Sequence, residues 1–257
     1  MFSTRWSGRE LAFEQDIQRG ARGAPARRVQ EWLSLNGHPT VVDGDFGGGT
    51  ERAVRNFQAA AGLKTSGTVT RATWERLVAP LATALEMQPG SGSIQQAVLR
   101  VARAHLAQKP REVGGPNAGP WVRLYMNGNE GAEWAWCAGF VCFVMAQACS
   151  RLGISVPVKP TFSCDSLAAH AKAAGLFVAG RDIESGKRPT SELGEVCLFL
   201  CRRTDDDWTH VGFAYDFDRA LTFATLEGNT NDEGSREGYE VCCRTRSVAD
   251  KDFIRLS

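Results

Sequence analysis

Residues 133–145 read EWAWCAGFVCFVM, and this stretch decides the fold that the sequence predicts for the second half of the chain. Its apolar run predicts a buried helix over 137–152, with Cys137 in the first turn. Backbone N–H groups at a helix N-terminus carry partial positive charge, which favours a thiolate. The small residues Ala138 and Gly139 would let a substrate approach closely. Cys137 is therefore a candidate nucleophile, although the same pattern suits a cysteine buried at the start of a core helix.

Helices and strands follow one another in blocks around this segment. We expect helices over 94–107 and 163–175, then strands over 196–201, 210–215, 221–227 and 239–244. Helices followed by consecutive strands predict an α+β domain with an antiparallel sheet.

A thiolate nucleophile needs a base, and the chain has four histidines. His210 is the best placed of them, because it begins a predicted strand directly after the polar turn 204–208. The next predicted strand ends in Glu227 and Asn229, and antiparallel pairing would bring one of them close to His210. An acceptor there fixes the imidazole tautomer and stabilises the imidazolium. Asn231 is a weaker third candidate.

Four short motifs occur in a characteristic order: Trp-Cys-Ala at 136–138, Gly-Glu-Val at 194–196, His-Val-Gly at 210–212 and Glu-Gly-Asn at 227–229. In this order they resemble the CHAP group of the NlpC/P60 papain-like hydrolases, over about residues 94–245. The resemblance implies a papain-like α+β domain whose antiparallel sheet packs against the helix that carries the cysteine.

The same resemblance implies roles for individual residues. Cys137 would be the nucleophile and His210 the base. Glu227 would orient His210, and Asn229 would support the site or the oxyanion; which of the two is the main partner stays open. We also expect Trp136 to contact the substrate.

Metal chemistry is not expected. Some relatives carry an aspartate-rich calcium loop before the cysteine, but residues 127–133 hold only two carboxylates. No CxxC or HxxxH spacing for zinc occurs, so we expect no metal and no cofactor, and a zinc amidase is kept as the enzyme alternative. The eight cysteines fall mostly in apolar segments, where free buried thiols are expected.

Residues 20–80 predict a small bundle of three short helices. The first has its apolar residues between 29 and 35 and stops at Asn36-Gly37. The second begins with Thr50 as its N-cap and ends at Gly62, and the third spans 70–78.

The runs RRVQEWLSLNG, DGDFGGGTERAVRNFQAAAGL and SGTVTRATWERL within this region resemble the peptidoglycan-binding type 1 domain. The resemblance implies binding of wall peptide or glycan, without catalysis. We expect ligand contacts from Asp43, Phe46, Arg55 and Gln58. Asp43 can also lock the glycine-rich turn by accepting backbone N–H bonds. Phe46 shares with Phe57 and Trp74 the spacing typical of core aromatics.

The remaining segments connect these two regions. Residues 1–19 are expected to be a lead-in with a short amphipathic helix through Leu11, Phe13 and Ile17. Residues 81–93, rich in Pro, Gly and Ser, are the expected linker, although 81–87 could extend the preceding helix. The catalytic domain is expected over 94–257.

Composition and the N-terminal sequence limit the partners and the cellular location that we expect. A net charge of +1 over 257 residues gives no support for nucleic-acid binding. No apolar stretch reaches the roughly 20 residues needed to cross a bilayer. Charged residues interrupt the N-terminal segment, which predicts no signal peptide. We therefore expect a monomer that is made in the cytoplasm and acts on the wall, in the periplasm, after release.

Together these patterns predict a peptidoglycan hydrolase, either an amidase or an endopeptidase, that uses cysteine nucleophilic catalysis. The arrangement resembles a modular phage or prophage endolysin. Two alternatives are a wall amidase toxin delivered by a secretion system and a catalytically inactive wall-binding structural protein.

Overall fold

The computed structural model describes residues 5–231 and 238–257, so the first four residues of the expected lead-in lie outside it. The chain divides into two compact units. One comprises the described residues up to Glu86 together with Arg111–Trp134. The other comprises Met87–Pro110 and the described residues from Ala135 to Ser257. The segment 111–134, expected within the catalytic domain, is thus grouped with the N-terminal helices.

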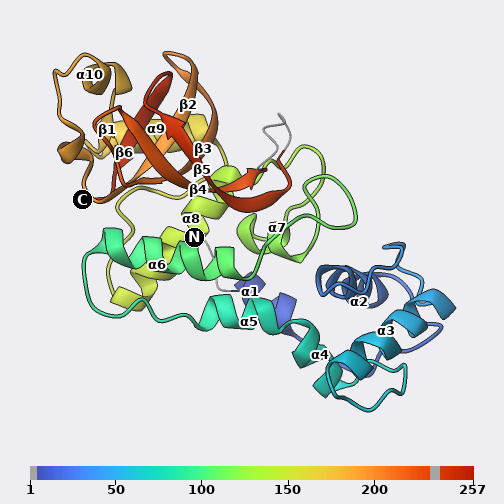
Figure 1. Cartoon of the computed structure of the whole chain (residues 1–257). Helices are drawn as coiled ribbons and strands as arrows, with labels where there is room; N and C mark the ends of the chain where they lie inside the picture. Colours follow the sequence, from blue (N-terminus) through green and yellow to red (C-terminus); the bar gives the residue numbers. More distant parts are fainter. Residues whose placement is uncertain (1–4, 232–237) are drawn as a thin grey trace. The chain divides into compact units, whose positions relative to one another are not determined.

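The N-terminal unit is helical (Figure 1). Its helices are α1 (Arg5–Leu11), α2 (Ala24–Leu35), α3 (Gly48–Ala60), α4 (Arg71–Leu77), α5 (Ala79–Glu86) and α7 (Pro120–Tyr125). Pro25 lies in the first turn of α2, where its fixed φ suits the helix and its missing N–H costs nothing. Thr70 caps α4 by accepting a hydrogen bond from the N–H of Thr73.

Two local predictions for this unit are wrong. Helix α3 begins at Gly48 with Gly47 as its N-cap, and Thr50 lies inside the first turn. The Thr50 hydroxyl does not cap the helix because it is buried and accepts a hydrogen bond from Gln30 Nε2 at 3.1 Å. Helix α1 ends at Leu11, and Ile17 instead forms an isolated antiparallel bridge with Val69. The residues from 79 to 86, mostly within the expected linker, form the separate helix α5.

A buried arginine joins the two sequence segments of this unit. Arg123 of α7 lies 2.7 Å from Glu10 and 2.7 Å from Glu31, both of them buried, and 2.9 Å from Glu130. Burial opposes its charge, but the hydrogen bonds that Arg123 donates to Glu31 and Glu10 outweigh burial and raise its pKa. Removing one partner of such a buried group leaves an uncompensated charge and is strongly destabilising. Arg123 therefore ties α7 to α1 and α2.

The C-terminal unit combines helices with one sheet, so the chain is α+β as predicted (Figure 1). Its helices are α6 (Ile94–Ala107), α8 (Cys137–Leu152), α9 (Cys164–Ala173), α10 (Gly180–Glu184) and the 3-10 helix η1 (Thr190–Leu193). Its strands are β1 (Phe177–Val178), β2 (Val196–Thr204), β3 (Asp207–Tyr215), β4 (Thr222–Thr230), β5 (Glu240–Ser247) and β6 (Lys251–Arg255). Helices α6 and α8 have the predicted bounds, and the four predicted strands are present as β2 to β5.

The sheet has the strand order β1-β6-β2-β3-β4-β5, and every neighbouring pair is antiparallel. Strands β1 and β6 were not predicted. Strand β6 pairs with β2 from Cys197↔Arg255 to Cys201↔Lys251, so the last strand of the chain lies inside the sheet.

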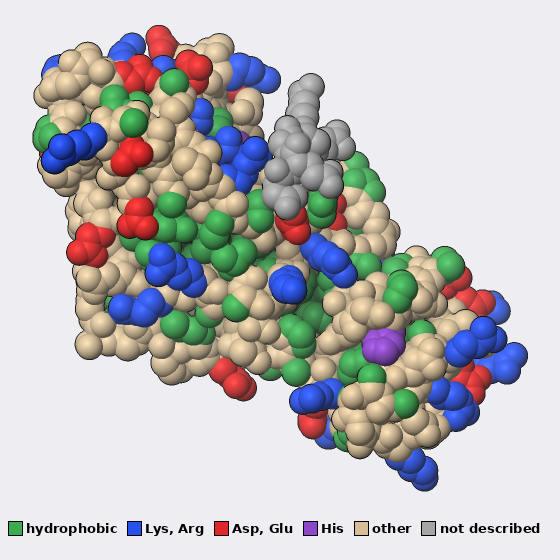
Figure 2. All heavy atoms as spheres, in the orientation of Figure 1, with side chains coloured by type: hydrophobic (Ala, Val, Ile, Leu, Met, Phe, Trp, Pro, Cys, Tyr) green, Lys and Arg blue, Asp and Glu red, His purple; other side chains and the backbone are tan. Residues whose placement is uncertain are grey.

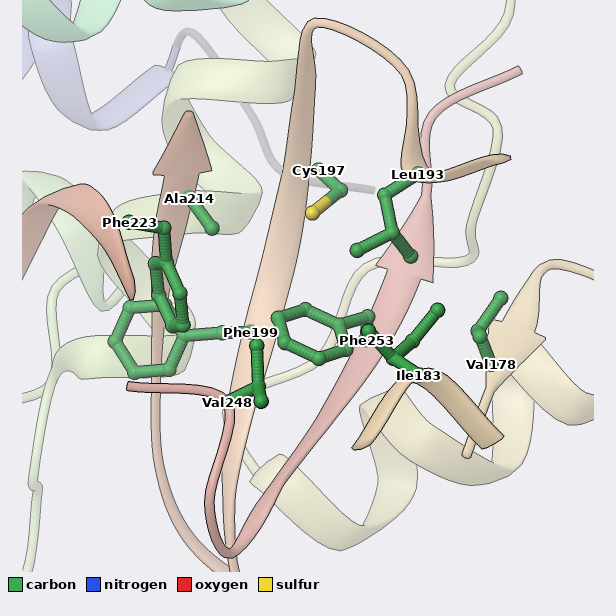
Figure 3. Packing of buried hydrophobic residues seen from close by; sticks show 9 residues of the cluster. All are labelled: Val178, Ile183, Leu193, Cys197, Phe199, Ala214, Phe223, Val248 and Phe253. Carbon is green, nitrogen blue, oxygen red and sulfur yellow. The ribbon is translucent and has the colours of Figure 1, made fainter. Parts of the chain in front are cut away.

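A buried aromatic cluster packs against the sheet (Figure 3). The ring of Phe223 lies 5.7 Å from that of Phe199 and 5.7 Å from that of Phe253, centroid to centroid. Leu193 and Ile183, which precede the sheet strands β2 to β6, close the cluster. Fully burying each phenylalanine contributes roughly 1.5–3 kcal/mol, so these contacts fix β2, β4 and β6 relative to one another.

Helix α8 packs closely on the central strands. The Phe140 ring meets that of Phe213 at 6.1 Å with an edge-on geometry. A Cβ at Gly228 would lie 2.7 Å from Phe140, so only glycine fits there. This close approach brings the first turn of α8 to the end of β4.

Charge is mixed on the surface. On the face that Figure 2 shows, basic and acidic side chains lie intermingled, in keeping with the net charge of +1. Among the described residues, none of the helices combines the length and the apolar character that a membrane crossing requires.

Candidate active site

The first turn of α8 carries the candidate nucleophile. Cys137 is the first residue of α8 and is buried, with a relative exposure of 5%. The N–H of Trp136, the N-cap, donates to Asn229 Oδ1 at 2.8 Å. Asn229 has a φ of 56°, a left-handed conformation that asparagine tolerates better than most residues. Asn229 thus attaches the N-terminus of α8 to the end of β4.

His210 of β3 lies between a carboxylate and the cysteine. Its Nε2 is 2.8 Å from Glu227 Oε2. Cys137 also acts on the ring, because it is among the groups that raise the pKa of His210. The structure therefore brings the predicted residues Cys137, His210 and Glu227 together in one group.

Two residues that the sequence did not reveal hold Glu227. Arg246 of β5 donates from Nε to Oε1 and from a terminal nitrogen to Oε2, both at 2.7 Å. The Thr225 hydroxyl donates to Oε1 at 2.5 Å. Glu227 is fully buried, and a bidentate arginine matches the geometry of a carboxylate. No local signal marks Arg246, because its contact depends on the register of β4 with β5.

The electrostatics of these three residues favour an ion pair between Cys137 and His210. Burial raises the pKa of Glu227, but the hydrogen bonds from Arg246 and His210 prevail and lower it, so that the carboxylate is charged. Burial also disfavours imidazolium, yet hydrogen bonds to Cys137 and Glu227 raise the pKa of His210 to about 10. The pKa of Cys137 is lowered well below its usual value, first by a hydrogen bond from Cys164 and then by His210. Both shifts favour thiolate and imidazolium over the neutral pair.

The glycine-rich turn of the N-terminal unit is held from inside. Asp43 Oδ1 accepts from the N–H of Asp45 at 2.9 Å, as predicted, and also from Gln30 Nε2 at 2.8 Å. Gln30 is buried, and its Oε1 accepts a hydrogen bond from the N–H of Gly44 at 2.8 Å. These bonds lower the pKa of Asp43. Gln30 was missed at the sequence level.

Gln58 has the same relation to a second turn. Its Nε2 donates to the carbonyl of Thr68 at 2.8 Å, and its Oε1 accepts from the N–H of Gly67 at 2.9 Å. In both turns, the side chain of a glutamine accepts a hydrogen bond from the N–H of a later glycine. That shared pattern could have pointed to Gln30. Ligand contact by Gln58 stays a prediction, and its buried amide already has internal partners.

The other predicted contact residues differ in exposure. Phe46 is fully buried, as the spacing of the aromatics predicted, and so is the side chain of Trp136. Arg55 and Asp43 are exposed. Arg55 pairs with Glu51 at 2.9 Å and donates to the carbonyl of Thr65 at 2.7 Å. Of the predicted wall contacts, Asp43 and Arg55 are the two that reach the surface.

Within residues 5–231 and 238–257, no group of three or more His, Cys, Asp or Glu side chains is arranged to hold a metal ion. All eight cysteines are free thiols.

Comparison with known proteins identifies the N-terminal region. The family model described as "Putative peptidoglycan binding domain" matches residues 22–77. Two curated relatives, both named spore cortex-lytic enzyme and both from Bacillus cereus, are 46% identical over 70 residues. That match covers 27% of this chain and 27% of each relative.

Among solved structures, the crystal structure of the SleB N-terminal domain is 43% identical and has a TM-score of 0.26. The match covers 27% of this chain and 99% of that structure. Residues 22–77 thus form a peptidoglycan-binding domain, and bacterial peptidoglycan is the partner that this domain supports.

Proposed function

We propose that this protein is a peptidoglycan hydrolase that cleaves an amide bond of the bacterial cell wall with Cys137 as its nucleophile. The proposal rests on the group formed by Cys137, His210 and Glu227, in which Glu227 binds the His210 ring, on a polypeptide that also has a peptidoglycan-binding domain. A helix-borne cysteine facing a strand-borne histidine suits a papain-like hydrolase of the CHAP group. We assign the C-terminal unit to that class.

The reaction follows from the ion pair. The Cys137 thiolate attacks the amide carbonyl carbon and forms a C–S bond. The negative charge that develops on the oxygen is stabilised by backbone N–H groups of the first turn of α8, which lack helical acceptors. The His210 imidazolium then donates its proton to the departing nitrogen as the C–N bond breaks, which leaves a thioester.

Water completes the cycle. Neutral His210 removes a proton from a water molecule, which attacks the thioester and releases the carboxylic acid product. The thiolate leaves, and His210 holds the proton again. Glu227 stays ionised throughout, because Arg246 keeps its pKa low, and it stabilises the imidazolium.

The binding domain supplies proximity to an insoluble substrate. A weak wall-binding module raises the effective concentration of the catalytic unit at the polymer. The names of the two Bacillus cereus relatives describe lysis of the spore cortex, which supports a lytic function here. We propose a phage or prophage endolysin that reaches the wall after release from the cytoplasm, with a secretion-delivered toxin as the second setting.

The proposal is tested with purified sacculi. Wild-type protein should clear the suspension, and Cys137→Ala should lose at least about 10³-fold in rate because the nucleophile is absent. Cys149→Ala is the matched control, since Cys149 is a buried thiol of the same helix outside the group of Cys137, His210 and Glu227. It should retain activity. Masses of the soluble fragments then identify the bond that is cut.

Two other outcomes would count against the proposal. Equal clearing by wild type and Cys137→Ala would reject Cys137 as the nucleophile. Sedimentation of both proteins with sacculi, with no clearing by either, would favour a wall-binding protein without activity.

A further inference from the structure

A second thiol lies against the candidate nucleophile. The sulfur atoms of Cys137 and Cys164 are 3.8 Å apart, and both side chains are buried, at 5% and 8% relative exposure. Cys164 is the first residue of α9, as Cys137 is of α8. Two helix N-termini therefore bring two thiols into contact, and the mechanism above uses only one of them.

The structure fixes Cys164 at this point from both sides. Ser163 caps α9, and its hydroxyl accepts from the N–H of Ser166 at 3.3 Å. Asp165 Oδ1 accepts from the N–H of Trp208 at 2.7 Å. Trp208 precedes His210 by two residues on β3, so the start of α9 is attached to the strand that carries the base.

We propose that Cys164 is a positioning residue of the site: its S–H donates a hydrogen bond to the sulfur of Cys137 and keeps that sulfur ionised and aimed. This inference rests on the proposed function only for the use to which the thiolate is put. One proton lies between the two sulfurs. It stays bonded to Cys164, so Cys137 carries the negative charge.

The surrounding groups favour a charged Cys137 and a neutral Cys164. His210 faces Cys137 from β3 with Glu227 and Arg246 behind it, and it favours the Cys137 thiolate. Asp165 and Cys201 act on Cys164 and disfavour a charge there. The contact with Cys137 and the burial of Cys164 raise the pKa of the Cys164 thiol. Cys142 of α8, whose pKa burial raises to about 12, adds no competing thiolate.

The test measures the thiolate directly. The rate at which iodoacetamide alkylates Cys137 is followed against pH, by mass spectrometry of the peptide that contains it. In Cys164→Ala the midpoint should move up by about one pH unit or more, as loss of a hydrogen bond to a charged group implies. Cys164→Ser keeps a donor and should shift less. Cys149→Ala should behave as wild type.

Cys164→Val fills the site without a donor and repeats the test if the alanine variant does not fold. Midpoints of Cys164→Ala or Cys164→Val that coincide with that of the wild type would overturn the proposal. Because alkylation needs no peptidoglycan, a shifted midpoint in a protein that does not cleave sacculi would reject the proposed function and leave the role of Cys164 standing.

Discussion

At the scale of single residues, Glu227 sets the orientation and the charge of the His210 ring. One oxygen accepts from His210 and Arg246, and the other from Arg246 and Thr225. Because all of these partners lie on the sheet, Glu227 both orients the imidazole and fixes its charge. Asn229 bonds instead to the backbone of Trp136. In this structure the main partner of His210 is therefore Glu227.

Replacing this carboxylate should move the alkaline limit of activity. A raised imidazole pKa means that His210 keeps the proton needed by the leaving amine up to about pH 10. In Glu227→Gln the alkaline limb of kcat/KM against pH should move toward neutral pH, and the maximum should fall about 10²–10⁴-fold. An unchanged alkaline limb in a folded variant would show that Glu227 does not set the charge of His210.

Sequence reasoning identified Cys137, His210 and Glu227 because each belongs to a short motif in a recognisable order. It missed Arg246, Thr225 and Cys164. Their contacts cross from one strand or helix to another, and strand register and helix packing decide which residues meet. Gln30 was missed for the same reason, because its partners lie 13 to 20 residues away.

The close packing of α8 on β4 governs the site at the scale of elements. Cys137 begins α8, and Glu227 and Asn229 lie on β4, so any movement of α8 from the sheet changes the distances from Cys137 to the groups on the sheet. Gly228 permits this packing, since Phe140 occupies the space where its Cβ would lie.

Gly228→Ala should therefore loosen the site. The added methyl group would force Phe140 and α8 outward, at a cost of about 1–3 kcal/mol for overpacking. The expected result is a lower denaturant midpoint and lost activity together. Gly48→Ala adds the same methyl group to α3, where no atom lies within 4 Å, and should leave both unchanged. Full activity in Gly228→Ala would show that this packing does not hold Cys137 in register.

Elements with strong local patterns could be predicted. Helices α6 and α8 have continuous apolar faces and capping residues, and their bounds were correct. Strand β1 has two residues and β6 has five, flanked by charges, so neither has a distinct local pattern. Both depend on pairing across the sheet, which connects β6 at the end of the chain to β2 about fifty residues earlier.

The chain as a whole is not divided where its sequence suggests. Residues 111–134 immediately precede the first turn of α8 along the chain, yet they belong with the N-terminal helices. Arg123 carries this connection through Glu10 and Glu31. Composition could not reveal that a later segment is grouped with the first unit.

A chain truncated to begin at Met87 tests this division. It removes Glu10 and Glu31, so the segment 111–134 should lose its order and become open to proteolysis. Limited digestion should cut this segment in the truncated chain much faster than in the full chain. Equal protection in both would contradict the grouping of 111–134 with the N-terminal unit.

The proposed function requires that Cys137 cleaves an amide bond of peptidoglycan. The most direct measurement counts new free amino groups and new reducing sugar ends released from purified sacculi by wild type and by Cys137→Ala. We expect amino groups without reducing ends for the wild type, and neither for Cys137→Ala. Reducing ends from the wild type, or amino groups released equally by both proteins, would contradict it.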